Sequence, residues 1–286
     1  FQTVNQNLTD SLGNKLIQDQ TIKFDLPEAA DPLDLVLNEI LFNPKTGGSD
    51  FIELYNRSDK TIDLSTLFLA DQAFDDVVSI STNFLLAPDG YVVLTESPQA
   101  ILSQYSTTLA NRIIQTDLPS LPNDEGSVTL YRLNEDNDII EIDAFVYNED
   151  FHNALVDDVD GVSLERIQPN APTQDENNWQ SAASTVGFGT PTLRNSQFFE
   201  SSTALTTAFQ LADDQISPDG DGFQDLLVIE YELERDCFIA NMRLFDAAGR
   251  YVTDITKSEL LGTKGTYIWE GVNQDGMAIP PGIYIL

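Results

Sequence analysis

The amino-acid sequence predicts an all-β protein made of β-sandwiches, and two observations support this. Apolar and polar residues alternate with a period of two in short runs along almost the whole chain. These runs are separated by clusters rich in glycine, aspartate and asparagine, which are typical of tight turns. Short strands at this spacing favour β-sandwiches over layers of alternating helices and strands.

Three runs illustrate the expected half-buried strands. Residues 128–131 alternate in this way, and residues 140–146 place their even-numbered apolar side chains on one face. Residues 227–233 place their odd-numbered apolar side chains on one face, with two glutamates on the other. The expected turns lie at residues 45–49, 89–90, 134–138 and 275–276.

One helix is expected near Ser97. Serine is a residue type that caps helices, and Pro98 suits the first helical position. Ala100, Ile101 and Tyr105 then provide an apolar stripe. We therefore expect a short helix within an otherwise β-rich chain.

The charge balance excludes several classes of partner. The chain has 286 residues, with 14 Lys and Arg against 47 Asp and Glu, and its formal net charge is −33. Such a charge repels phosphate backbones and anionic lipid, so we expect no nucleic-acid partner. Apolar residues make up 41%, which is enough to bury a core. No apolar run reaches the roughly 18 residues of a membrane span, so we expect no direct membrane insertion.

The low numbers of cysteine and histidine argue against catalysis. One cysteine rules out an intrachain disulfide and a thiolate zinc site, and one histidine would have to carry most hydrolytic chemistry. His152 lies between Asp150 and Asn153, where we expect a surface histidine rather than a catalytic base. The sequence contains no Gly-x-Ser-x-Gly motif and no glycine-rich phosphate loop.

Glu39 and Glu53 invite comparison with the paired carboxylates of a glycosidase. Both lie on expected strands beside Asn38, without neighbouring aromatic residues that would stack on a sugar. We expect them instead to satisfy backbone or arginine partners inside the sandwich. This segment is therefore expected not to be an enzyme.

Two polar segments divide the chain. Residues 27–34 follow a short N-terminal piece, and residues 194–206 are rich in serine and threonine and lack a period. We expect an N-terminal remnant at residues 1–33, a sandwich at 34–196, a linker at 197–206 and a second domain at 207–286. The last residues read as a strand that has just begun, so we expect the chain to be a segment of a longer protein.

The first of these domains resembles the lamin-tail domain. The resemblance rests on residues 35–44, 51–56 and 62–64, followed by residues 160–166, Trp179, residues 189–191 and Asn195 in the family's order. Thr192 departs from the family, which has a glycine after Gly-Thr-Pro. The resemblance implies an immunoglobulin-like β-sandwich of a non-catalytic family, which occurs in bacterial surface and secreted proteins and in nuclear lamins.

The second domain is similar to the immunoglobulin-like module of the flagellar hook-capping protein. The matching residues are 216–225, 244–252, 269–271, 275–276 and 281–284. They also resemble C-terminal domains that direct Bacteroidota proteins through type IX secretion. Residues 1–33 are similar to the closing hairpin of bacterial immunoglobulin-like domains such as those of S-layer proteins. Together these resemblances imply a tandem immunoglobulin-like array at the extracellular or outer-membrane surface of a Gram-negative bacterium.

A run of aspartates in the second domain is a candidate calcium site. Asp219, Asp221 and Asp225 are separated by glycines, and the carbonyl of Phe223 is a further candidate ligand. Calcium takes about six to eight hard oxygen ligands, and carboxylates at alternate loop positions can converge on one ion. Glu230 lies in an expected strand and does not complete an EF-hand. The alternative is a solvated turn in which the aspartates cap backbone amides.

A second acidic loop holds Asp157, Asp158 and Asp160, with Glu149 and Asp150 nearby. We expect a charged, solvated connection here, and cation binding by the three aspartates is the alternative.

These observations predict a non-catalytic secreted or cell-surface protein that works by protein–protein contact, in adhesion or in the assembly of an outer-membrane or secretion complex. Its partners would be other envelope or secretion proteins, selected by the acidic surface when they are basic or bridged by calcium. The alternative is a set of accessory modules of a secreted hydrolase whose catalytic domain lies outside this segment.

Overall fold

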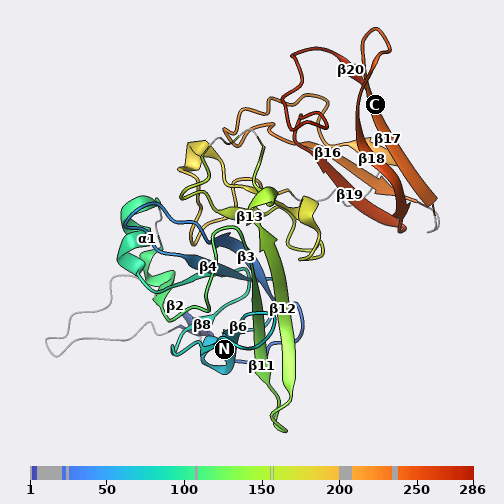
Figure 1. Cartoon of the computed structure of the whole chain (residues 1–286). Helices are drawn as coiled ribbons and strands as arrows, with labels where there is room; N and C mark the ends of the chain where they lie inside the picture. Colours follow the sequence, from blue (N-terminus) through green and yellow to red (C-terminus); the bar gives the residue numbers. More distant parts are fainter. Residues whose placement is uncertain are drawn as a thin grey trace, which may run out of the picture.

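The computed structural model describes residues 2–4, 21–23, 26–106, 109–154, 156, 158–199, 208–233 and 238–286. Strands dominate these residues, and α1 (Pro98–Gln104) is the one α-helix in the described part. Figure 1 shows two β-rich units, with the yellow part of the chain between them. The predicted all-β fold is confirmed.

The first unit is a sandwich of two sheets. In order across the sheet, the larger contains β10 (Ile113–Gln115), β9 (Tyr91–Thr95), β4 (Phe51–Asn56), β3 (Leu35–Leu41), β13 (Leu164–Arg166) and β14 (Trp179–Ser181). The smaller contains β12 (Ile139–Asn148), β11 (Glu125–Leu133), β6 (Leu67–Ala70) and β7 (Val77–Ser79). Strands β9 and β10 pair parallel, whereas the other neighbours in both sheets pair antiparallel.

The second unit contains two three-stranded sheets. One contains β15 (Phe209–Leu211), β16 (Leu227–Glu232) and β19 (Lys264–Trp269), and the other contains β18 (Tyr251–Leu261), β17 (Phe238–Asp246) and β20 (Tyr284–Ile285). The predicted inward face of residues 227–233 is confirmed, because Leu227, Ile229 and Tyr231 pack in one core with Met242 and Leu244.

Two further strand pairs complete the described strands. Strand β5 (Ile62–Asp63) pairs with β8 (Leu85–Leu86), and β1 (Gln2–Val4) pairs antiparallel with β2 (Thr21–Lys23). Most of the hairpin expected at residues 1–33 lies outside the described residues.

The core of the first sandwich lies between its two sheets, where apolar residues of β3, β4 and β9 meet those of β6, β11 and β12. Trp179 stacks on Phe145, with ring centroids 3.9 Å apart, and its indole nitrogen donates to the carbonyl oxygen of Thr173. In the second unit the indole of Trp269 is also buried and donates to the carbonyl oxygen of Val272. Both tryptophans are core residues.

A β-bulge at Asn38 decides which side chains of β3 face outward. The pairing with β4 passes from Leu37 directly to Glu39. Leu37 before the bulge and Ile40 after it both lie in the core. Glu39 therefore points to the outer face of the larger sheet, away from the smaller sheet.

A third layer covers this outer face. Helix α1 and the residue after it, Tyr105, pack on Leu41, Phe51 and Val93. Residues 189–197 cross the same face beside the helix and donate hydrogen bonds to glutamates of β3, β4 and β13.

Of two local predictions, one was confirmed and the other was wrong. The helix expected near Ser97 is confirmed as α1, with Ser97 at the N-cap and Pro98 as its first residue, although the Ser97 side chain makes no capping hydrogen bond. Residues 140–146 do not keep their even-numbered side chains inside: Phe145 is buried and Val146 is 43% exposed. The cause is a register shift between β11 and β12 at Leu130, which reverses the faces of β12.

The segments expected to separate domains make contacts with the first sandwich where they are described. Ala30 is fully buried, and the amine of Lys60 lies 2.6 Å from carboxylate oxygens of both Asp31 and Asp34. The backbone N–H of Phe199 donates to the carbonyl oxygen of Ile167. Residues 200–207 lie outside the described residues.

Candidate functional site at the junction of the two sandwiches

Three aspartates of the second unit converge on one point. One carboxylate oxygen from each of Asp219, Asp221 and Asp225 lies within 4.8 Å of the others. Asp219 is exposed, whereas Asp225 is only 3% exposed. The structure thus brings together the three carboxylates that the sequence spacing identified. The ring of Phe223 is 69% exposed and lies away from the core.

The aspartates also shape the loop that carries them. Oδ1 of Asp221 accepts the N–H of Phe223 at 2.7 Å, and Oδ1 of Asp219 accepts the N–H of Asp221 at 3.2 Å. Asp225 accepts the N–H groups of Gly220 and Gly222 at 2.8 and 2.7 Å. Both glycines have positive φ, of 73° and 88°, which lets the chain curl around the carboxylate of Asp225.

The same loop makes contact with the first sandwich. The carbonyl oxygen of Gly220 accepts both the N–H and the hydroxyl of Ser184, at 2.8 and 2.7 Å. The hydroxyl of Thr185 donates to the carbonyl oxygen of Asp221. The amide of Gln197 donates to Asp225 at 3.4 Å. The carboxylate cluster therefore lies in the junction between the two units.

A second contact joins the units near β14. The side-chain amide of Gln180 donates to Oε1 of Glu270 at 2.8 Å. Glu270 is half-buried, and burial raises the pKa of its carboxyl group.

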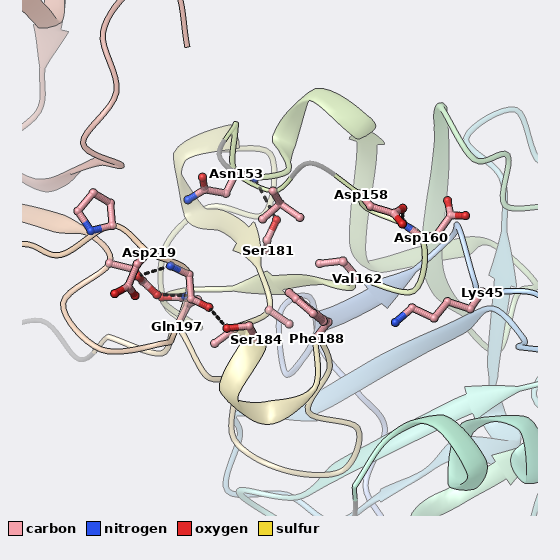
Figure 2. Close-up of a pocket in the computed structure, with 16 residues that line it drawn as sticks. Lys45, Asn153, Asp158, Asp160, Val162, Ser181, Ser184, Phe188, Gln197 and Asp219 are labelled. Carbon is pink, nitrogen blue, oxygen red and sulfur yellow. Dashed lines mark hydrogen bonds between the residues drawn. The ribbon is translucent and has the colours of Figure 1, made fainter. Parts of the chain in front are cut away.

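A cavity of about 510 Å³ lies beside the aspartate loop and is lined by residues of both units. Figure 2 shows Asp219 and Gln197 at one end and Lys45, Asp158 and Asp160 at the other. Val162 and Phe188 line the wall between these ends.

The second predicted acidic loop does not form a comparable cluster. Oδ1 of Asp158 accepts the N–H of Asp160, and Oδ1 of Asp160 accepts the amide of Asn43, at 3.1 and 2.9 Å. Within the described ranges, these two aspartates do not converge with a third acidic or histidine side chain. Asp157 lies outside the described residues.

His152 is buried, so the prediction of a surface histidine was wrong. The residue is only 7% exposed, and the centroid of its ring lies 5.7 Å from the ring centroid of Phe42. Nδ1 lies 2.9 Å from Oγ of Ser181, and this oxygen also accepts the N–H of Asn153. Burial lowers the pKa of His152 from 6.5 to about 4.

A catalytic role for His152 does not fit this geometry. Nε2 is buried and has no hydrogen-bond partner among the described residues, so no carboxylate orients the imidazole. A general base of the serine hydrolase type needs such an orienting group and access to substrate. His152 is a neutral core residue.

Three glutamates are buried on the outer face of the larger sheet. Glu39 lies opposite Glu53 of β4 on one side and opposite Glu165 of β13 on the other. None of the three is more than 1% exposed. Glu39 accepts the N–H of Thr190 and Glu53 accepts the N–H of Thr192, which confirms the prediction of backbone partners.

Burial is the largest cause that raises the pKa of all three carboxyl groups. Repulsion from a neighbouring glutamate raises the pKa of Glu39 and of Glu53 further. These side chains are covered by residues 189–197 and hold that segment in place, so they are not the open pair of a glycosidase.

Sequence reasoning missed Glu165 and the segment that covers it. One signal was present: Leu164 and Arg166 flank Glu165 in a strand, so Glu165 must point to the opposite face. The burial of that face could not be predicted from the sequence, because it depends on residues 189–197, which form no strand.

Comparison with known protein families finds a match to part of the chain. Residues 28–149 match the family model described as the Lamin Tail Domain. This family has an immunoglobulin-like β-sandwich fold, which agrees with the two-sheet architecture of the first unit. The match covers most of the first unit but not the expected span of 34–196, since it begins earlier and ends before β13.

A search of curated proteins found no match to this chain. Among the described residues, no helix has both the length and the apolar character needed to cross a membrane.

Proposed function

We propose that this chain is a non-catalytic, secreted or cell-surface protein whose tandem β-sandwiches act through protein–protein contact, in adhesion or in the assembly of an outer-membrane or secretion complex. The lamin tail match supports a β-sandwich interaction module. The net charge of −33 favours envelope partners that are basic or bridged by a cation. The proposal includes a calcium ion bound at the junction between the two units.

The observation that carries the proposal is the double role of residues 217–225. This loop contacts Ser184, Thr185 and Gln197 of the first sandwich and also presents three converging carboxylates. Two modules can contact one partner together only if their separation and orientation suit it. A cation held by this loop would stiffen the junction and fix that orientation.

Calcium suits the loop because the converging atoms are hard oxygens from carboxylates. A carboxylate oxygen that accepts one backbone N–H retains a lone pair for a cation. Asp219, Asp221 and Asp225 would hold the ion, and the carbonyl of Phe223 and water would complete its coordination. The ion would also relieve repulsion among the three negative charges.

Thermal unfolding in calcium and in chelator tests this site. A ligand present at about a hundred times its dissociation constant adds about 2.7 kcal/mol to the stability of the state that binds it. We expect calcium to raise the melting temperature of the native chain, and the Asp219→Asn/Asp221→Asn variant to lose this response.

Asp214→Asn is the matched control, because Asp214 is exposed on the same segment and lies outside the converging group. It should keep the full calcium response. An unchanged melting temperature in the native chain, or an equal response in the double variant, would remove calcium from the proposal.

The partner is tested by binding of the purified chain to the envelope fraction of the bacterium that produces it. We expect saturable binding that weakens as ionic strength rises, because the acidic surface attracts basic groups. Equal association with the soluble fraction would contradict an envelope partner.

The second candidate is an accessory role beside a hydrolase domain outside this segment. It shares the prediction that residues 1–286 have no turnover of their own. Assays on nuclease, esterase and glycosidase substrates, with calcium and with chelator, should show none. Any chelator-sensitive turnover would contradict both candidates, and a catalytic motif encoded upstream in the gene would favour the second.

A further inference from the structure

Residues 189–197, here called the strap, form an irregular segment that lies on the outer face of the larger sheet. Gly189 allows close approach, since a Cβ there would lie 2.6 Å from the ring of Tyr105. Asn195 continues the contact, because its side-chain amide donates to the carbonyl oxygens of Asn38 and Arg166 at 2.9 and 2.8 Å. The strap is therefore docked along its length without forming a strand.

Three buried glutamates accept most of the strap's polar contacts. Glu39 accepts the N–H of Thr190 at 2.8 Å, and Glu53 accepts the N–H of Thr192. Glu165 accepts the hydroxyl of Ser196 and the N–H of Gln197, at 2.7 and 3.0 Å. The glutamates thus hold the strap at its start, its middle and its end.

One hydroxyl group lies between two of the three glutamates. Oγ1 of Thr190 lies 3.1 Å from Oε2 of Glu39 and 2.7 Å from Oε1 of Glu165. A hydroxyl has one proton and can donate to only one of these oxygens. The hydroxyl therefore bridges two buried carboxyl groups that face each other across β3 and β13, and it supplies one proton to the pair.

The charged groups around the cluster do not compensate it. In the described part of the chain, no lysine or arginine forms an ion pair with any of the three glutamates. Arg194 of the strap stacks on Phe198 at 3.6 Å, and Arg166 of β13 points into the core, where it pairs with Asp143.

The remaining titratable groups near the cluster are tyrosines. Tyr55 of β4, Tyr91 of β9 and Tyr105 after α1 lie on this side of the sheet, and burial raises the pKa of each. Lys45 lies over the ring of Phe188, 5.8 Å from its centroid, just before the strap begins. Ionised glutamates here would face one another in a buried site to which the described residues supply no cation.

We propose that the strap is a proton-dependent clasp: the buried glutamic acids hold it on the sheet while the cluster retains its protons, and their ionisation releases it. Release would also break contacts near the junction, because Ser196 accepts the N–H of Ala183 and Gln197 donates to Asp225. The strap would thereby couple pH to the position of the second sandwich.

The direction of the pH dependence follows from proton binding. The folded state holds protons that the unfolded chain releases above about pH 4.5, so the clasp is closed at acidic pH and weakens as pH rises. For each proton lost, the closed form should weaken by about tenfold per pH unit between about 4.5 and the raised pKa of the closed cluster, which is about 8 for Glu39.

Amide hydrogen exchange, corrected for the intrinsic effect of pH, tests the clasp in the full chain. Between about pH 5 and about pH 9 we expect protection of Thr190, Thr192 and Gln197 to fall by more than tenfold, while amides shared by β4 and β9 stay protected. Unchanged strap protection would overturn the proposal. So would loss of protection in the strap and in β4–β9 together, because the strap would then not open on its own.

Glu39→Gln is the decisive variant, because glutamine keeps the shape of the neutral acid and cannot ionise. We expect its strap protection to depend less on pH than that of the native chain. Glu141→Gln, at an exposed position of β12, is the matched control and should behave as the native chain does. If strap protection in Glu39→Gln depends on pH as strongly as in the native chain, the proposal is also overturned. If that variant fails to fold, the pH dependence of exchange in the native chain tests the proposal by itself.

Discussion

Arg166 and Asp143 form an ion pair inside the first sandwich, with Nη1 3.3 Å from Oδ2 and side chains that are only 1% and 3% exposed. The pair joins β13 of the larger sheet to β12 of the smaller. Burial raises the pKa of Asp143 and lowers that of Arg166, so desolvation outweighs the mutual attraction for both groups. Hydrogen bonds from Thr173 and from the N–H of Leu37 satisfy the carboxylate.

Removing one partner of this pair should be costly. Asp143→Ala leaves the guanidinium of Arg166 buried without its counter-ion, and we expect a loss of about 3–5 kcal/mol in the free energy of unfolding. Urea denaturation measures this loss. Arg250→Ala is the control, because it removes an ion pair whose arginine side chain is 82% exposed, and it should cost no more than about 1 kcal/mol. Equal losses in the two variants would contradict the account of the buried pair.

His152 should make the first sandwich sensitive to acid. Its folded pKa of about 4 lies below the 6.5 of the unfolded chain. Its contribution is therefore complete above pH 6.5 and is lost as pH falls towards 4, by about 3 kcal/mol in all.

The His152→Asn variant isolates this effect, since an asparagine can still bond Ser181 but does not titrate. The difference in unfolding free energy between the native chain and the variant should shrink as pH falls through this range. A difference that stays constant with pH would show that His152 does not titrate on unfolding.

Alanine substitutions at two glycines of the aspartate loop distinguish the effect of backbone strain from the effect of lost contact between the units. Gly222 has a φ of 88°, and a Cβ there would lie 2.8 Å from the Cβ of Ala183 in the first sandwich. Gly220 has a φ of 73°, and a Cβ there would meet nothing within 4 Å. Alanine at either position strains the backbone by a similar amount, roughly 1 kcal/mol.

Gly222→Ala should therefore disturb the junction, whereas Gly220→Ala should only lower the stability of the loop. Exchange of the Ser184 amide reports on the junction, because this group donates to the carbonyl oxygen of Gly220. We expect faster exchange in Gly222→Ala than in Gly220→Ala. The same rate in both variants would mean that the loop does not pack on Ala183.

The strand content and the aspartate loop were predictable because both depend on local pattern. The alternation in residues 227–233 identifies the buried face of β16, and the spacing of Asp219, Asp221 and Asp225 identifies a loop in which carboxylates meet. Both predictions can be made without information about the residues that pack on the element.

The outward glutamates and the buried histidine depend on tertiary structure. The bulge at Asn38 changes the phase of β3, so a strict period of two misplaces Glu39. Burial of that outer face requires the strap, which lies more than a hundred residues further along the chain. His152 lies in a polar stretch of sequence, yet contacts with Phe42 and Ser181 bury it. Local pattern carries no information about such contacts.

We propose that calcium at the aspartate loop sets the contact between the two sandwiches. Exchange of the Ser184 amide in saturating calcium and in chelator tests it most directly, because this amide belongs to the first sandwich and its acceptor, Gly220, belongs to the loop. We expect slower exchange in calcium than in chelator for the native chain, and no such difference for the Asp219→Asn/Asp221→Asn variant. Equal exchange of Ser184 in calcium and in chelator would contradict it.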